Sequence, residues 1–325
     1  MNKIITVTLN PAIDRITEVA DFHVGDVQKA PAAHVYPAGK GVNVARALSC
    51  MGKDVTAIAL LGAESASFFN SIKDICTLDS DFSYGRITTE WILTNTPTRT
   101  NNTFIDPIRS TETHIREVVD IKEPFPKEEV SKAISKHCQS GDVLVFAGSL
   151  PTNAIGEDLA DLVRFYRQKG AKVVVDTSGP ALNSAIQASP TLIKPNLSEL
   201  QELVGHKFYT KSEIIAAARE ISLTHNIPYV VVSMGEEGAI MVADKAYDAM
   251  FMLRLSQNQL HAVGCGDTMV AALAEQLLVN ASPEDMLKHG TAAGVVNLMT
   301  EGPGLISAEK MRRVLDAVEI SEILN

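Results

Sequence analysis

The strongest chemical signal in the sequence is a pair of glycines followed at once by an acid. Gly264 and Gly266 lead into Asp267, where an apolar helical pattern begins. N–H groups at a helix start have no partner inside the helix, and glycines let a phosphate approach them closely. A carboxylate at the same point could remove the proton from a hydroxyl that attacks this phosphate. Asp is also a preferred helix N-cap, so on this segment alone capping and phosphate chemistry remain alternatives.

A second glycine-flanked segment brings a positive charge to another helix start. Gly39 and Gly41 surround Lys40, and Asn43 follows with both a hydrogen-bond donor and an acceptor. The segment is not a P-loop, because the lysine is followed by glycine rather than by Ser or Thr. It is not a dinucleotide fingerprint either, because Val44 stands where the third glycine belongs. A structural turn and a ligand contact both fit the pattern.

Oxygen ligands that suit Mg²⁺ stand at the start of a third predicted helix. Lys194 ends a short apolar run, and Asn196 and Glu199 follow it three residues apart. On a first helical turn, residues three apart share a face. Such ligands suit Mg²⁺ that is held largely through its waters. The same spacing is typical of a capping box, which is the alternative interpretation.

Weaker signals follow other predicted strands. Ser233, Gly235 and Gly238 form a segment that suits either a hairpin turn or backbone lying along a nucleotide. Asp14 follows the first strand and could accept hydrogen bonds from sugar hydroxyls, although on its own it indicates turn chemistry. Arg99 offers a fork of donors to a phosphate, although an Arg in a β segment usually faces solvent.

The elements that would carry these residues alternate between strands and helices, which predicts a parallel sheet with right-handed crossovers. Expected strands are 4–9, 55–61, 143–147, 173–176, 191–193 and 229–233, and expected helices include 41–51, 157–168 and 212–223. Two segments, at about 12–37 and 86–119, break this rhythm with partial alternation of apolar and polar residues. They predict antiparallel strands outside the main sheet, which form a flap on one large domain.

Composition limits the partners. The chain has 325 residues with 29 Lys and Arg against 39 Asp and Glu, a formal net charge of −10. This deficit of basic residues argues against nucleic-acid and anionic-membrane partners. Four cysteines without a zinc or redox spacing indicate reduced thiols, and no apolar stretch reaches the length of a membrane span. We therefore expect a cytoplasmic protein in which a local pocket supplies positive charge to any anionic ligand.

In this order, the motifs resemble those of the ribokinase-like, phosphofructokinase-B family of carbohydrate kinases. The resemblance runs over essentially the whole chain and rests on segments 10–14, 38–47, 98–101, 148–151, 176–182, 194–199 and 264–268. It implies an α/β fold with a three-layer, doubly wound, mostly parallel sheet and a small β flap, all in one kinase domain over 1–325. The first and fourth segments look most like the branch that includes 1-phosphofructokinase and tagatose-6-phosphate kinase.

The resemblance implies transfer of the γ-phosphoryl group of ATP to a primary hydroxyl of a ketohexose monophosphate, with Mg²⁺ as cofactor. Fructose 1-phosphate is the expected acceptor, and tagatose 6-phosphate, another sugar phosphate or a nucleoside is the alternative. By the family pattern, the general base is Asp267, and the transferred phosphate accepts hydrogen bonds from Gly264, Cys265 and Gly266. The Mg²⁺ ligands are Asn196 and Glu199. The nucleotide contacts are Lys194, Asn196, Ser233, Gly235 and Gly238. By the same pattern, Asp14, Gly39 and Asn43 hold the sugar hydroxyls of the acceptor. Lys40 and Arg99 are candidates for binding the sugar phosphate or the transferred group. In homologues the flap covers the sugar and often forms a dimer contact, so a homodimer through the flap is expected.

Three departures from the family pattern bear on activity. Cys265 stands where Ala is usual, Ala262 lacks a usual hydroxyl, and 117–119 replaces the usual Glu-Pro-Gly of the flap. A thiol at a helix N-terminus tends towards a low pKa, so we expect alkylation of Cys265, with protection by ATP. The departures raise a catalytically silent sugar-phosphate sensor as an alternative, against which the retained Asp267 argues. A nicotinamide oxidoreductase fits least, because no complete glycine fingerprint exists.

Overall fold

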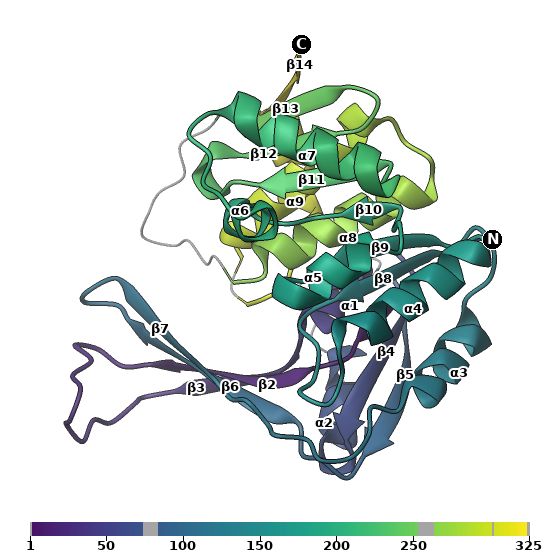
Figure 1. The fold of residues 1–325 in the computed structure, drawn as a ribbon. Helices are drawn as coiled ribbons and strands as arrows, with labels where there is room; N and C mark the ends of the chain where they lie inside the picture. The colour runs from purple at the N-terminus through teal and green to yellow at the C-terminus, as the bar shows by residue number, and fades with distance from the viewer. Residues whose placement is uncertain (1, 74–83, 253–262, 301, 324–325) are drawn as a thin grey trace.

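A large mixed sheet forms the centre of the protein (Figure 1). The structure, a computed structural model, describes residues 2–73, 84–252, 263–300 and 302–323. Within these residues, ten strands pair in the order β14-β13-β12-β11-β10-β9-β8-β1-β4-β5. Their bounds are β1 (Ile4–Thr8), β4 (Val55–Gly62), β5 (Ile87–Thr94), β8 (Val143–Ala147), β9 (Lys172–Asp176), β10 (Leu192–Ile193), β11 (Tyr229–Ser233), β12 (Ala239–Val242), β13 (Ala246–Phe251) and β14 (Val318–Ile323).

The strands from β11 to β5 are all parallel, as the alternation of strands and helices predicts. Only the C-terminal hairpins, β12 to β14, add antiparallel strands to the sheet in the described residues. The central strands β1, β4 and β8 are buried along their whole length. Strands that are covered on both faces need near-continuous Val, Ile and Leu, so these runs could be recognised in the sequence. Each of the six strands predicted for the main sheet is confirmed, with ends that differ by at most one residue.

Helices cover both faces of the sheet, which gives three layers (Figure 1). One hydrophobic cluster joins one face to α1 (Lys40–Cys50), α2 (Ala66–Phe69), α8 (Cys265–Leu278), α9 (Pro283–Leu298) and α10 (Ala308–Asp316). The other joins the opposite face to α3 (Lys127–His137), α4 (Gly156–Gln168), α5 (Gly179–Ile186), α6 (Leu197–Val204) and α7 (Lys211–His225). Neighbours Ile4 and Ile5 on β1 belong to different clusters, since successive side chains point to opposite faces. Among these helices of the described chain, none is long and apolar enough to cross a membrane.

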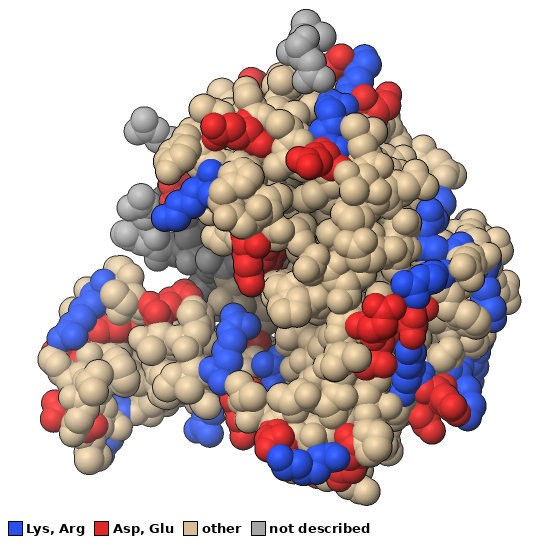
Figure 2. Space-filling model, in the orientation of Figure 1, with Lys and Arg blue, Asp and Glu red and all other residues tan. Residues whose placement is uncertain are grey.

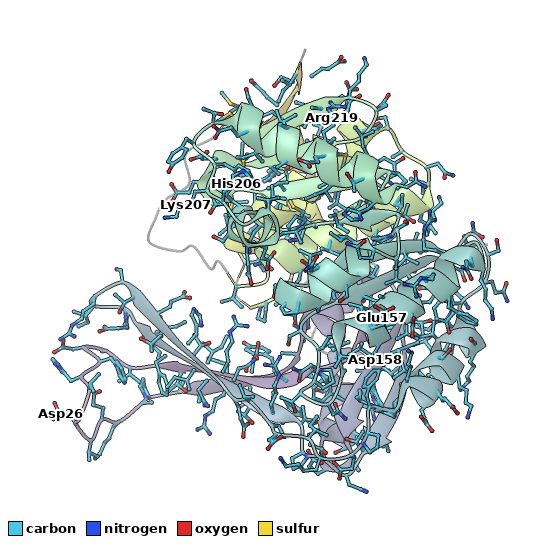
Figure 3. All side chains as sticks on the ribbon, in the orientation of Figure 1. Asp26, Glu157, Asp158, His206, Lys207 and Arg219 are labelled. Atoms are coloured by element: carbon cyan, nitrogen blue, oxygen red, sulfur yellow. The ribbon has the colours of Figure 1, made fainter. Side chains whose placement is uncertain are left out.

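The flap is a second, four-stranded sheet that extends away from the body (Figure 1). In the described residues its order is β3-β2-β6-β7, with β2 (Ala12–Glu18), β3 (Ala33–Ala38), β6 (Arg99–Asp106) and β7 (Thr111–Arg116). Asp26, between β2 and β3, lies at the outer end of this sheet (Figure 3). Its strands come from the two segments from which the flap was predicted, but the boundaries and the pairing need two corrections.

The first correction concerns the start of the second segment, since Ile87–Thr94 belongs to the main sheet. β5 pairs in parallel with β4 over all eight of its residues and forms one edge of the large sheet. Its partial alternation arises because an edge strand is covered unevenly, here by Phe69, whose ring meets the ring of Trp91 edge-on. The second correction concerns pairing, since β2 and β6 run parallel within a flap that was expected to be antiparallel.

A close contact between α1 and β1 fixes where the second glycine-flanked segment lies. A Cβ on Gly41 would stand 2.4 Å from Thr8 Oγ1 and 3.0 Å from the carbonyl oxygen of Val7. Real Cβ atoms are essentially never found at 2.4 Å from another atom, and 3.0 Å from backbone is tighter than most contacts, so glycine lets the helix approach the strand end to this degree. Gly294 in α9 provides a contrast, because its nearest neighbour would be the carbonyl oxygen of Cys265 at an ordinary 3.4 Å.

We predict opposite effects on stability from the same substitution at these two helical glycines. Gly41→Ala should destabilise the protein by about 1–3 kcal/mol, because the added methyl group overpacks the contact with β1. Gly294→Ala should stabilise it by about 0.5–1 kcal/mol, because alanine restricts the unfolded chain and fits the space. Thermal unfolding followed by circular dichroism would measure both shifts. Equal shifts would contradict the assigned approach of α1 to β1.

Candidate active site

Two helices begin at the same place with their first N–H groups uncapped. α1 starts after Gly39 (φ 124°) and α8 starts after Gly264 (φ 94°), and within the described residues no side chain caps either start. Both φ values favour glycine strongly. The two helices pack against each other, and a side-chain hydrogen bond joins their first turns. Converging helix starts present backbone donors and the positive ends of two dipoles, which suits a phosphate.

The turn before α8 is held by buried contacts. Asn297, fully buried in α9, donates from Nδ2 to the carbonyl of Val263 (2.9 Å) and accepts from the N–H of Gly304 (3.0 Å). A Cβ on Gly264 would stand 2.7 Å from the nitrogen of Gly304 and 2.9 Å from Cα of Pro303. Close packing against Pro303 and Gly304 therefore fixes the turn, and its N–H groups belong to the first turn of α8.

Asp267 lies at this junction and is 7% exposed. Asn43 Nδ2 donates to its Oδ2 across 2.7 Å. Burial raises the pKa of Asp267 to about 6, an effect that nearby Asp176 reinforces and that Lys40, Asn43 and Lys194 oppose. A carboxylate with a pKa near neutrality can both take up and release a proton under cellular conditions, as a general base must.

Two lysines and one buried aspartate place a net positive charge beside Asp267. Asp176, at the end of β9 and 1% exposed, lies 3.3 Å from the ammonium groups of both Lys40 and Lys194. Burial acts to raise the pKa of Asp176, but the two lysines outweigh it and lower the pKa overall. Asp176 in turn raises the pKa of Lys40 against the opposing effect of burial. Lys194 Nζ lies about a van der Waals contact, 3.5 Å, from where a Cβ on Gly266 would stand.

Asn196 and Glu199 form the capping box that the sequence left open as an alternative. Glu199 N donates to Asn196 Oδ1 and Asn196 N donates to Glu199 Oε2, each at 2.8 Å. The charge of Glu199 also raises the pKa of Lys40, so the start of α6 lies near the lysine cluster, which consists of Lys40, Lys194 and Asp176. Among the described residues, no group of three or more His, Cys, Asp or Glu could hold a metal ion directly. Two fixed oxygen-bearing side chains suit Mg²⁺ that keeps most of its waters.

The segment of Ser233, Gly235 and Gly238 is a turn between the antiparallel strands β11 and β12, with a short 3₁₀ helix at 235–237. Gly238 has a φ of 83°, and a Cβ there would collide with the carbonyl oxygen of Ala249 on β13. An isolated parallel bridge pairs Ser233 with Asn196, so this turn lies beside the start of α6. The hairpin interpretation is thus confirmed, at a position next to the lysine cluster.

The remaining two residues predicted from the sequence lie on the flap side. Asp14 accepts a hydrogen bond from Asn101 Nδ2 (2.8 Å), and burial raises its pKa. Arg99 donates to the carbonyls of Asn10 (3.0 Å) and Pro11 (3.3 Å), in the loop that follows β1. Its guanidinium is therefore anchored at the base of the flap rather than fully solvated.

A cavity of about 440 Å³ opens where the sheet reverses its order. β1 lies between β4 on one side and β8 on the other, and such a switch point leaves a crevice at the carboxyl ends of the strands. Asn10, after β1, donates to Ser149 Oγ (3.1 Å) after β8 and so bridges the crevice. Arg99 and Ser149 line the cavity, whereas Asp267, Lys40 and Lys194 do not.

The expectation of a reactive Cys265 is wrong in this structure. Burial raises the pKa of its thiol to about 11, and this outweighs the hydrogen bond from Asn297. The helix start favours a thiolate, but desolvation in a tightly packed turn disfavours it more strongly. The effect expected from Ala262 concerns a residue outside the described part of the chain.

Sequence reasoning gave no role to three residues that hold this site together, namely Asp176, Arg46 and Asn297. All three are polar and at most 1% exposed. Asp176 stands at the end of an apolar strand, which is a signal for a ligand-side position. Arg46 and Asn297 lie within helices, and the sequence offers no signal of what they contact.

Several known proteins are similar to this chain over nearly its whole length. A tagatose-6-phosphate kinase from Staphylococcus epidermidis is 28% identical, covering 98% of this chain and all of the relative. A 1-phosphofructokinase from Xanthomonas campestris is 32% identical over 98% of both chains. Phosphofructokinase-2 from Escherichia coli has a similar structure, with a TM-score of 0.86, 27% identity and coverage of 97% and 99%.

The expected fold is also shared with an Arabidopsis thaliana ribokinase, at a TM-score of 0.72 and 17% identity, which concerns the fold alone. The family model described as pfkB family carbohydrate kinase matches residues 7–311. Because this match spans nearly the whole chain, and includes both glycine-flanked helix starts, the protein belongs to the pfkB family of carbohydrate kinases.

Proposed function

We propose that the protein transfers the γ-phosphoryl group of ATP to the primary hydroxyl of a ketohexose monophosphate, as a single kinase domain. The preferred acceptor in this proposal is fructose 1-phosphate and the product is fructose 1,6-bisphosphate. The observation that carries the proposal is a buried Asp267, bonded to Asn43, at two uncapped helix starts beside a pair of lysines. Several relatives, from organisms as different as Haemophilus influenzae and Xanthomonas campestris, are named 1-phosphofructokinase.

In this mechanism Asp267 removes the proton of the attacking hydroxyl. Asn43 engages Oδ2, so we assign Oδ1 to the acceptor. A bond forms between the acceptor oxygen and the γ-phosphorus while the bond to the leaving oxygen of ADP breaks, and the proton passes to Asp267. Phosphoryl transfer needs positioning and charge stabilisation more than covalent chemistry. The N–H groups of Gly264, Cys265 and Gly266 position the transferred group and stabilise its negative charge.

Lys40 and Lys194 add positive charge at the same point. Their shared partner Asp176 keeps both ammonium groups close to Asp267, so they serve the transferred phosphate rather than a remote one. The nucleotide would lie along Ser233, Gly235 and Gly238, beside the start of α6. Mg²⁺ belongs to the proposal through Asn196 and Glu199, whose reciprocal bonds fix their oxygens to receive its waters. When bound, the ion neutralises phosphate charge.

The phosphate that the acceptor already carries is assigned to Arg99. Its bonds to two backbone carbonyls orient the guanidinium at the edge of the 440 Å³ cavity, where further donors of the fork can face a ligand. Asp14, Gly39 and Asn43 are assigned to sugar hydroxyls. Positive charge in this proposal is therefore local, in keeping with the interspersed acidic and basic residues on the face in Figure 2.

The flap enters the proposal as a cover and as a homodimer contact. It exposes apolar side chains, with Val35 on β3 45% exposed and Ile115 on β7 57% exposed. Apolar surface on an extended sheet favours burial against a partner. Escherichia coli phosphofructokinase-2 has been solved in a tetrameric inhibited form, so oligomers occur in a similar structure. A cytoplasmic location, where ATP is available, completes the proposal.

A second acceptor, tagatose 6-phosphate, is kept because a tagatose-6-phosphate kinase is 28% identical over 98% of the chain. The same site would serve it, since both acceptors offer a primary hydroxyl and a distant phosphate. A silent sugar-phosphate sensor is disfavoured. Burying a carboxylate is costly, and a protein that only binds has no use for a base held in this position.

The proposal is tested by an ADP-release assay with ATP and a panel of acceptors. We expect the highest kcat/KM with fructose 1-phosphate, lower values with tagatose 6-phosphate and fructose 6-phosphate, and background rates with unphosphorylated sugars and nucleosides. Replacement of Arg99 by Ala should reduce the preference for phosphorylated acceptors without changing the KM for ATP. Equal rates with free sugars and sugar phosphates would exclude the assigned acceptor class.

The base is tested by Asp267→Asn. The variant should fold and bind sugar phosphate normally, because Asn has the shape of Asp, while kcat falls about 10²–10⁴-fold. Asp244→Asn is a matched control, since Asp244 is exposed in the turn after β12, where its Oδ1 accepts a hydrogen bond from the backbone N–H of Lys245. Near-normal turnover by Asp267→Asn would remove Asp267 from the mechanism.

The pH dependence of kcat/KM should follow the ionisation of Asp267. Its pKa is raised to about 6, so below this pH the carboxyl holds a proton and cannot accept another. The rate should rise as pH increases through about 6 and then level off, because kcat/KM reports groups of the free enzyme. A coupled assay between pH 5 and 8 would measure this limb. A limb near pH 4, the ordinary range of Asp, would contradict the assigned environment.

A further inference from the structure

Arg46 is a fully buried cation one helical turn beyond Asn43, at 0% exposure. Its Nη1 donates to Asn43 Oδ1 (3.2 Å) and to the carbonyl of Pro303 (2.6 Å), and its Nη2 donates to the carbonyl of Pro37. Burying a guanidinium is costly, and arginines are rarely found at this depth without a specific arrangement of partners. The acceptor contacts and the base assigned above give this residue no role.

The contact with Asn43 decides which way that amide points. An Asn amide has a donor end and an acceptor end, whereas a guanidinium carries only donors. With Oδ1 held by Arg46, Nδ2 must face Asp267, as the 2.7 Å bond requires. A reversed amide would set N–H groups against the guanidinium and an oxygen against the carboxylate, so both contacts would become repulsive.

The other two bonds of Arg46 tie this amide to distant segments. Pro37 lies on β3, where the flap joins the body, and Pro303 lies next to Gly304, which packs under the turn before α8. One guanidinium therefore donates to Pro37 at the base of the flap, to Pro303 in the segment that packs against the turn before α8, and to Asn43, the hydrogen-bond partner of Asp267. Such a fork fixes geometry more firmly than a single point charge does.

We propose that Arg46 is a positioning residue for phosphoryl transfer, which acts through the Asn43 amide to hold the carboxylate of Asp267 in its reactive orientation. The inference rests on the proposed role of Asp267 as the base. The other charged groups that face Asp267 are Lys40 from α1, Lys194 from the end of β10 and Asp176 from the end of β9. None of them depends on Arg46 for its own ion pair.

The test uses Arg46→Met, which keeps a long apolar stem and removes every donor. The freed amide can then reverse and offer its oxygen to Asp267, which favours the protonated carboxyl. We expect kcat to fall about tenfold, which corresponds to the loss of one charge-assisted hydrogen bond. The acid limb of kcat/KM should move to higher pH, and the KM for ATP should change less than about twofold. Arg46→Lys, which keeps one donor, should recover part of both effects.

A double-mutant cycle separates positioning from general stability. In an Asn43→Ala background, Arg46→Met should lower kcat no further, because the two residues act as one unit. Arg167→Met is the matched control, since Arg167 also donates to a backbone carbonyl, that of Ser189, before the starts of β9 and β10 and not at their carboxyl ends, where Asp176 and Lys194 lie. It should leave the pH profile unchanged. Additive losses in the cycle, or a fall in kcat without movement of the acid limb, would overturn the inference.

Unaltered protein supplies a measurement that does not depend on the variants folding. The side-chain amide of Asn43 should show slow hydrogen exchange by NMR and should titrate with the same midpoint as kcat/KM. Fast exchange, or no titration, would overturn the role of Arg46. Failure of the proposed function is distinguishable, because an active Asp267→Asn enzyme refutes the base itself, whereas an inactive one with an unaffected Arg46→Met enzyme refutes only this inference.

Discussion

The hydrogen bond between Asn43 and Asp267 is the interaction on which the rest of the site depends. It joins two residues that are 224 positions apart in the sequence and holds the first turns of α1 and α8 together. A buried carboxylate needs hydrogen bonds and nearby positive charge to remain ionised at neutral pH. Asn43 provides the first and the lysines around Asp176 provide the second. The same few contacts thus set both the position of the Asp267 carboxylate and its charge.

The topology of the sheet explains why these contacts meet where a ligand can reach them. β1 lies inside the sheet, with β4 as its neighbour on one side and β8 on the other. The loops after β1 and β8 diverge at this point, and Asn10 and Ser149 bridge them at the edge of the cavity. The close approach of Gly41 to Thr8 then places α1 over the end of β1. A protein with a formal net charge of −10 obtains a positive site in this way from helix starts, the half-buried Lys40 and the buried Lys194.

Much of this arrangement was predictable from the sequence because it depends on local patterns. Continuous apolar runs identify the central strands, and the glycines before Lys40 and Asp267 identify the two helix starts. β5 was assigned to the flap because an edge strand alternates in the same way as a flap strand, and only its pairing with β4 distinguishes them. Arg46 and Asn297 could not be predicted, since their partners lie far along the chain. For Cys265, the local rule on helix starts was applied correctly, but burial reversed its result.

The starts of α1 and α8 differ from the helix starts that carry a side-chain cap. α7, α9 and α10 begin after Thr210, Ser282 and Ser307, whose side chains cap their helices. Such a cap contributes about 0.5–2 kcal/mol, and a glycine in the same place contributes less. α1 and α8 begin after glycines and so forgo this stabilisation at the one place where free N–H groups are needed. A capping side chain at Gly264 would satisfy those donors, but it would occupy the space that a phosphate requires and would collide with Gly304. In the described part of the chain, α2, α3, α4 and α5 also begin without a side-chain cap. What sets α1 and α8 apart is that both begin after glycines with positive φ and that their first turns are joined, where a ligand would provide the missing acceptor while Asn297 and Arg46 support the turn before α8.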